Sequence, residues 1–307
     1  MATDILFQAL FFASGISLSL LLVIVLSWRF KIIMGHMKEK MGMKHSIYIT
    51  LISQTLGFLS PLKVGTFITK PIATKVISSN PVNKSFFASF FEQVFDIAWQ
   101  MVIIIPLLIL IGEAKLLSSL YIEVVIVALV VVGIVLMLKR NRLLVGLVWR
   151  LAKLMPKGAR KLGKRSGMTK SGAESMLRES VEHLSDLRLM AKMVIPTAVI
   201  ILVEPFIFQL SGFIFSVSLT FWTAFFVYWI SQIVGRLSGI PGGLVAKDLT
   251  SLALLVFVGV DTIVATQIVL VHRAMTMLSF IPPGGALSLY YGTRFASSGL
   301  SKKQPTF

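Results

Sequence analysis

Two acidic side chains inside an apolar run are the first residues of this sequence that could do chemistry. Glu92 and Asp96 are four residues apart, so a helix places both on one face. Carboxylates at membrane depth are costly unless a cation or a polar cavity faces them. The candidate partners are four cations in or beside other apolar runs, Arg273 first and then Arg236, Lys63 and Lys70. The pattern predicts either a structural ion pair or a charged lining for a polar substrate group.

Two Pro/Gly interruptions of the apolar pattern each carry a cation. They contain Pro61, Lys63 and Gly65 in segment 60–65, then Arg236, Pro241, Gly242 and Gly243 in segment 235–243. The start of a half-helix presents free N–H groups and a positive dipole end, which favour anions. With Lys63 or Arg236 added, such a site suits a phosphate, for example that of a lipid head group. The alternative is that both cations only extend to the membrane interface.

Several other kinds of chemistry lack the residues they need. Cysteine is absent, so a thiol nucleophile, a disulfide and a cysteine metal site are excluded. Gly242 and Gly243 are not part of a phosphate-loop or dinucleotide motif. The four histidines have no metal-ligand spacing, and His272, the one inside an apolar run, is expected to be a packed residue. We therefore expect no cofactor, no metal and no enzymatic activity.

The composition indicates what must position these residues. Of 307 residues 56% are hydrophobic and 14% are charged, with a mean hydropathy of +0.86. A soluble domain has about 25% charged residues, so a polytopic all-α membrane protein is predicted. The net charge of +17 raises the question of nucleic acid. However, 19 of the 30 Lys and Arg residues lie in 29–44 and 139–192, beside apolar spans, which is the positive-inside pattern of a membrane protein.

The expected elements follow from the apolar runs. These runs are 5–28, 46–60, 66–78, 86–111, 120–138, 193–213, 219–234, 249–260 and 261–281. The pieces on either side of each interruption are too short to cross a bilayer untilted. Irregular backbone at membrane depth is tolerated only where it is buried in protein or lines a cavity, so both pairs are predicted to form re-entrant hairpins. Pro282-Pro283-Gly284-Gly285 is expected to end the last span, and Asp261 to cap its start.

The chain is expected to have three parts. They are an N-terminal membrane half, 1–138, a basic amphipathic cytoplasmic segment, 139–192, and a C-terminal membrane half, 193–307. The charge pattern places the N-terminus outside a cell membrane. Pro61 precedes Glu92 by 31 residues and Pro241 precedes Arg273 by 32, so the halves share a plan. This plan is explained either by an internal structural repeat, which would point to a transporter's binding site, or by two independent breaks.

These motifs resemble the lysylphosphatidylglycerol synthase transmembrane-region family, also called flippase-like. The segment 60–65 with Lys70-Pro71 resembles its P-x-R-x-G-E…R segment, and Glu92-Gln93-Val94-Phe95-Asp96 its E-R-x-x-D signature. The run 240–244, with Asp248 and the later run 269–273, is similar to its P-G-G half. The departures are Thr66 and Asp248 for Glu, Val245 for Gly, and Lys63 and Lys70 for Arg. Lysine does not reproduce a bidentate guanidinium contact, so a different head group is expected.

The resemblance implies a flippase-like domain that moves a phospholipid or a lipid-linked head group between leaflets. In multidomain relatives an attached synthase makes the aminoacylated lipid. This chain ends at Phe307 without one, so aminoacyl transfer is not expected. The candidate substrate-binding residues are Pro61, Lys63, Gly65, Lys70, Glu92, Asp96, Arg236, Pro241, Gly242, Gly243, Asp248 and Arg273. Lys63, Lys70 and Arg236 would attract the phosphate, while Glu92, Asp96 and Arg273 would gate or line the path.

The expected partners are membrane lipids with phosphate head groups, and not nucleic acid. Two alternatives remain open. One is a membrane-embedded enzyme acting on lipid-linked substrates, although its catalytic residues are not evident. The other is an accessory protein that anchors a lipid-synthesis enzyme or a glycosyltransferase through 139–192.

Overall fold

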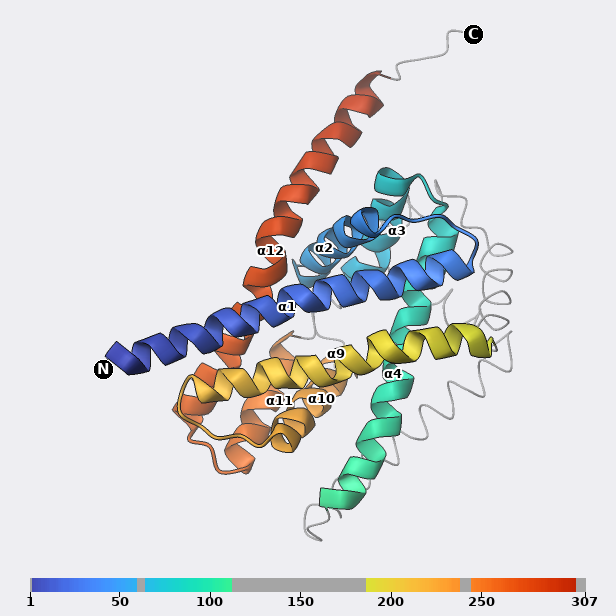
Figure 1. Ribbon diagram of the computed structural model, residues 1–307. Coiled ribbons are helices and arrows are strands. Elements are labelled where there is room, and N and C mark those ends of the chain that lie inside the picture. Colours follow the sequence, from blue (N-terminus) through green and yellow to red (C-terminus); the bar gives the residue numbers. More distant parts are fainter. Residues whose placement is uncertain (1, 60–63, 112–185, 238–243, 302–307) are drawn as a thin grey trace, which may run out of the picture.

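The computed structural model describes residues 2–59, 64–111, 186–237 and 244–301. These residues form helices and no strands, which confirms the all-α prediction. The helices are α1 (Ala2–His36), α2 (Met43–Leu59), α3 (Val64–Ser78), α4 (Val82–Ile111), α9 (Leu187–Phe213), α10 (Phe221–Leu237), α11 (Leu244–Phe257) and α12 (Thr262–Ser301) (Figure 1). Among them, Ile5–His36, Leu187–Phe213 and Thr262–Thr293 are long and apolar enough to cross a membrane.

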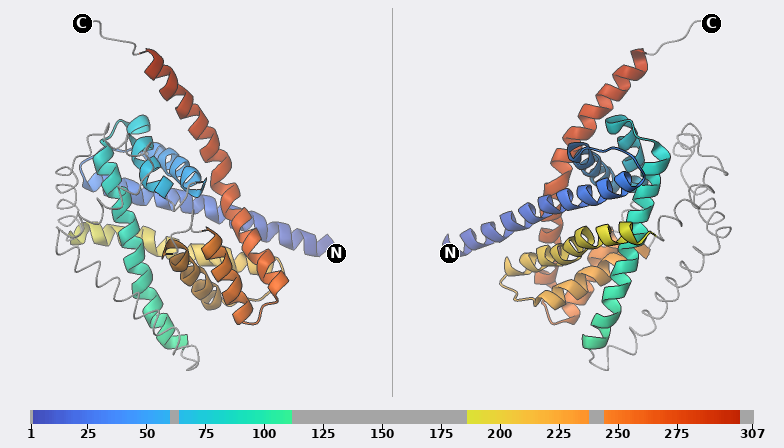
Figure 2. Two further views of the ribbon diagram at one scale, coloured as in Figure 1. Left: turned by 180° about the vertical axis from the view of Figure 1, so that it is seen from behind. Right: turned by 45° about the vertical axis from the view of Figure 1, so that its right-hand side comes forward.

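The helices α1 and α9 lie side by side and run in opposite directions (Figures 1 and 2). Near one end of the pair the rings of Phe11 and Phe213 are 5.7 Å apart. At the other end His36 Nε2 is 3.3 Å from a carboxylate oxygen of Asp186, which caps α9. Buried aliphatic side chains fill the space between these two contacts. The antiparallel pair therefore joins the first half of the described structure to the second.

The described helices of the two halves follow one pattern, a long helix, two short helices and a second long helix. In the first half α1, α2, α3 and α4 have 35, 17, 15 and 30 residues, and in the second half α9, α10, α11 and α12 have 27, 17, 14 and 40. In each half the two short helices pack against each other as a hairpin. Each hairpin also contacts the last helix of the other half, α2 on α12 and α10 on α4. This correspondence supports the interpretation as a structural repeat.

The tips of the two hairpins are not described. The turns at 60–63 and 238–243 lie outside the described residues, and so do 112–185, with the predicted span 120–138 and most of the basic segment 139–192. The re-entrant character of the hairpins, the cytoplasmic segment and the division into three parts therefore remain predictions.

The first expected span is too short, because α1 does not end at Trp28. It continues to His36, and Arg29 within it is 2% exposed. Phe30, Ile33 and Met34 follow Arg29 at helical spacing and are completely buried. The apolar face of the helix thus continues past the charge, because other helices cover it.

The prediction that Pro282 and Pro283 end the last span is wrong. Helix α12 passes through both prolines and continues to Ser301. Two prolines remove two backbone donors, which normally kinks or breaks a helix. Here α2 packs closely on this stretch, and the Thr55 hydroxyl donates a 2.8 Å hydrogen bond to the Phe280 carbonyl. Tertiary contact with the first hairpin therefore accompanies the helix through its two prolines.

Candidate functional site

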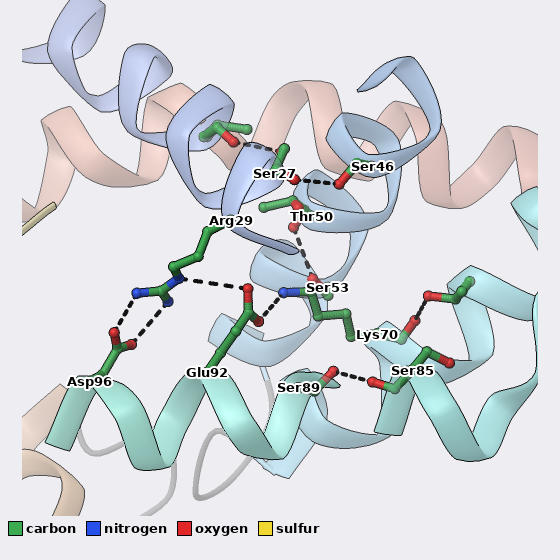
Figure 3. Close-up of polar contacts among 12 residues, drawn as sticks. Ser27, Arg29, Ser46, Thr50, Ser53, Lys70, Ser85, Ser89, Glu92 and Asp96 are labelled. Carbon is green, nitrogen blue, oxygen red and sulfur yellow. Dashed lines mark hydrogen bonds and ion pairs between the residues drawn. The ribbon is translucent and has the colours of Figure 1, made fainter. Parts of the chain in front are cut away.

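A buried network of four charged side chains joins α1, α3 and α4 (Figure 3). From α1, Arg29 makes a bidentate pair with Asp96: Nη1 donates to Oδ1, and Nη2 donates to Oδ2 at 3.1 Å. From α3, Lys70 Nζ donates to Glu92 Oε2. Arg29 Nε lies 3.7 Å from Glu92 Oε1. Two cations therefore face two carboxylates, and their formal charges cancel.

Three members of this network are almost completely removed from solvent, and the side chain of Asp96 is 14% exposed. Arg29, Lys70 and Glu92 are 2%, 5% and 4% exposed. The Lys70 ammonium also lies 4.1 Å from the centre of the Phe30 ring, a cation–π contact. Removing one member of such a network leaves an uncompensated charge, which typically costs about 3–5 kcal/mol. The network therefore clamps three helices together.

One contact inside the network is incomplete. Arg29 Nε and Glu92 Oε1 are both buried and have no hydrogen-bond partner in the described part of the chain. They face each other at 3.7 Å, beyond a hydrogen bond. Glu92 is thus held firmly by Lys70 and only electrostatically by Arg29.

Small hydroxyl residues bring the surrounding helices close together. The Ser46 hydroxyl of α2 donates a 2.6 Å hydrogen bond to the Ser27 carbonyl of α1. On α3 and α4, Thr74 and Ser89 donate to the carbonyls of Lys70 and Ser85 one turn earlier. Such side chains satisfy their own polar groups within the helix and allow near approach of a neighbour. These residues therefore allow the helices around the network to pack closely.

A second ion pair lies in the other half of the chain. Arg273 Nη1 of α12 donates to Asp248 Oδ2 of α11 at 2.7 Å. The two side chains are 31% and 22% exposed, in contrast to the buried network. The Arg273 guanidinium also lies 5.8 Å from the centre of the Phe58 ring, near the end of α2. Arg273 therefore contacts both hairpins.

The predicted partner of the two carboxylates is wrong. Arg273 pairs with Asp248, whereas Arg29 and Lys70 face Glu92 and Asp96. Lys70 was one of the further candidates. Arg29 follows an apolar span directly, so its charge fits a basic loop. The signal that could have identified it is the apolar pattern that continues beyond it at helical spacing.

The family model described as the lysylphosphatidylglycerol synthase TM region matches residues 5–284. The chain belongs to this family. The match spans both ion-pair groups, from the network of the first half to Arg273 in the second. No curated protein and no solved structure matches this chain. Membership of the family and its helices identify an integral membrane protein with a function related to membrane lipids.

Several residues expected from the lysylphosphatidylglycerol synthase TM pattern have no described placement. Pro61, Lys63, Pro241, Gly242 and Gly243 lie outside the described residues. Gly65 lies in the first turn of α3 and Arg236 near the end of α10, but the side chain of Arg236 is not described. An anion site at the two interruptions therefore remains a prediction.

His272 and Asp261 behave as the sequence indicates. The His272 ring is buried and meets the rings of Phe208 and Tyr228 edge-on, with centroid distances of 5.2 and 5.5 Å. Asp261 Oδ1 accepts hydrogen bonds from the backbone N–H groups of Ile263 and Val264, which caps α12. The first is a packed side chain and the second a helix cap.

Proposed function

We propose that this protein moves a phospholipid or a lipid-linked head group between the two leaflets of a cell membrane, and that it is not an enzyme. The observation that carries this proposal is the position of Arg273. Its partly exposed guanidinium lies between Asp248 of the second hairpin and Phe58 of the first. The chain's family is named for the membrane region of a lipid synthase, which supports a lipid as the substrate.

Arg273 has unused capacity to bind a phosphate. In the described part of the chain its side chain makes one hydrogen bond, to Asp248. A guanidinium presents five N–H donors in a planar fork that matches phosphate oxygens. Asp248 holds the guanidinium in place until a head group approaches. The phosphate then competes with a single carboxylate oxygen and not with a bidentate pair.

The same site borders a surface suited to acyl chains. Leu249 follows Asp248 and is 59% exposed, and Leu270, one turn before Arg273, is 57% exposed. Large exposed apolar side chains in a membrane protein face lipid. A head group at Arg273 can therefore keep its tails in the hydrocarbon while its charged part lies between the hairpins.

The ends of the antiparallel pair support the expected orientation. The His36–Asp186 contact places the end of α1 and the start of α9 at the same side. The basic segments 29–44 and 139–192 adjoin these two ends. By the positive-inside rule that side is the cytoplasm, and the N-terminus is outside.

Lipid movement in reconstituted vesicles tests the proposal. The full chain is reconstituted with a fluorescent head-group-labelled phospholipid, and a membrane-impermeant quencher reports the fraction that changes leaflet. Arg273→Gln removes the guanidinium and is expected to slow this exchange at least tenfold. The reason is that loss of charged hydrogen bonds to the phosphate costs about 1.5–3 kcal/mol. Lys192→Gln, at an exposed position of α9, serves as the matched control.

Two results would contradict the proposal. Unchanged exchange in the Arg273→Gln protein would show that this guanidinium does not handle the head group. Chemical turnover of the labelled lipid in detergent micelles, where no leaflets exist, would favour the enzyme alternative.

A further inference from the structure

The contacts between helices indicate how the two halves are related. Helices α1 and α9 occupy corresponding places in the order of elements and run antiparallel as neighbours. The contacts of α1 with α2, α2 with α3, α3 with α4 and α1 with α4 all have counterparts in the second half. The cross-contacts α2–α12 and α10–α4 also exchange under this correspondence. The contact of α1 with α12 is the exception, since α9 and α4 make no contact of similar extent in the described residues. Apart from this, the relations are those of an inverted repeat.

The two hairpin ion pairs occupy equivalent places in this repeat. In each half, the second arm of the hairpin pairs with the long helix that follows: Lys70 with Glu92, and Asp248 with Arg273. The polarity is reversed, because the cation is on the hairpin arm in the first half and on the long helix in the second. Both pairs therefore offer one cation and one carboxylate at the same point of their repeat.

The equivalent pairs differ in their exposure. The side chains of Lys70 and Glu92 are 6% and 5% exposed, whereas those of Arg273 and Asp248 are 31% and 22% exposed. Arg29 and Asp96 add a second ion pair beside the buried one. One half is thus closed around its ion pair and the other is accessible.

We propose that Lys70 and Glu92 form a second head-group station, equivalent to Asp248 and Arg273, and that the two stations open in turn on opposite sides of the membrane. This inference rests on the proposed function. A head group first meets the accessible Arg273. Exchange of conformation between the halves then closes that station and exposes Lys70. Inverted repeats support such an exchange because each half adopts the arrangement that the other leaves.

Labelling of single cysteines tests the alternation directly, since the chain contains no cysteine of its own. Ser89→Cys lies one turn before Glu92 at a position that is 3% exposed. Thr276→Cys lies one turn after Arg273 at a partly exposed position. A water-soluble maleimide reacts with hydrated thiols. In the otherwise unchanged protein we expect labelling of Thr276→Cys at least tenfold faster than that of Ser89→Cys.

Glu92→Gln is the perturbation, measured in both cysteine backgrounds. This substitution leaves the buried Lys70 ammonium without its carboxylate partner, which destabilises the closed conformation of the first half. Opening of that half lets water solvate the ammonium, so the open conformation is favoured. We expect Ser89→Cys labelling to rise at least tenfold and Thr276→Cys labelling to fall in the same proportion. The double variant Lys70→Met/Glu92→Gln removes both charges, so it should restore the slow labelling of Ser89→Cys.

The outcomes separate this inference from the proposed function, because labelling requires no lipid movement. Faster Ser89→Cys labelling with unchanged Thr276→Cys labelling would overturn alternation, and so would no change at either thiol. If Glu92→Gln does not fold, Lys70→Met removes the same pair from the other side and must give the same two shifts. If lipid exchange fails while the reciprocal shifts occur, the alternation stands and the substrate assignment is wrong.

Discussion

Gly284→Ala is a sharp test of how closely α12 approaches the first hairpin. A methyl group at this position would lie 2.5 Å from the backbone oxygen of Leu51 and 2.9 Å from its carbonyl carbon, and would also meet the Thr55 hydroxyl. Backbone atoms do not yield as a flexible side chain does. The added methyl must therefore push α12 away from α2. At the neighbouring Gly285 nothing lies within 4 Å of the same methyl.

Comparison with Gly285 separates the packing cost of the added methyl group from its gain in helix propensity. Replacing a helical glycine with alanine gains about 1 kcal/mol of helix propensity, and this gain applies to both positions. Overpacking typically costs about 1–3 kcal/mol and applies to Gly284 alone. Gly285→Ala is therefore expected to stabilise the protein by about 1 kcal/mol. Gly284→Ala is expected to be less stable than Gly285→Ala by about 1–3 kcal/mol.

Thermal unfolding of the two purified variants in the same detergent measures this difference. At about 2–4 °C per kcal/mol, Gly284→Ala should melt several degrees below Gly285→Ala. Lipid exchange should fall in the Gly284→Ala protein as well, because Phe58 and Arg273 lie on the two helices that are forced apart. Equal melting temperatures for the two variants would refute the close packing of α12 on α2.

Two further predictions concern the junction of α1 with its neighbours. Arg29→Gln should lower the free energy of unfolding by about 3–5 kcal/mol, because Asp96 loses its bidentate partner in a buried site. The control Lys31→Gln, at an exposed position, should change the free energy of unfolding by less than about 0.5 kcal/mol. Equal melting temperatures of these two variants would contradict the prediction. Asp186→Asn keeps the cap of α9 but removes the charge beside His36. The hydrogen bond from the Arg188 backbone N–H holds the pKa of Asp186 below its usual 3.8. The stability that the Asp186 charge contributes is therefore present above pH 3.8 and is lost as the pH falls below it. Melting temperatures of the two proteins should differ at pH 7 and converge in acid, and a difference independent of pH would argue against the charge.

Much of the fold was predictable because each helix carries its own apolar signal. The short expected runs 46–60 and 66–78 correspond to α2 and α3, and the expected run 86–111 lies within α4. The end of α12 was not predictable in the same way. Two prolines and two glycines are strong local signals for a helix end, but contact with a distant segment overrides them. Local propensity contains no information about Thr55, which lies 225 residues before Phe280 in the chain.

The candidate site was predictable in its members but not in its pairing. Glu92, Asp96, Lys70, Asp248 and Arg273 are charges in or beside apolar runs, and the structure brings them into ion pairs. Which cation faces which carboxylate depends on the packing of α1 against α4, which no single run specifies. A cation at the end of an apolar span usually marks the cytoplasmic side of the membrane. The sequence position of Arg29 therefore predicts a loop residue, whereas Arg29 lies in the buried network.

Helix α12 extends far beyond Arg273. From Arg273 to Ser301 the helix extends for about 42 Å at 1.5 Å per residue, more than the ~30 Å thickness of the hydrocarbon layer. Figure 2 shows the last turns of α12 projecting beyond the other helices. A tilt of a few degrees at the guanidinium therefore displaces the far end of the helix by several ångströms. A probe attached near the C-terminal end of α12 would therefore respond to a tilt of the helix at Arg273.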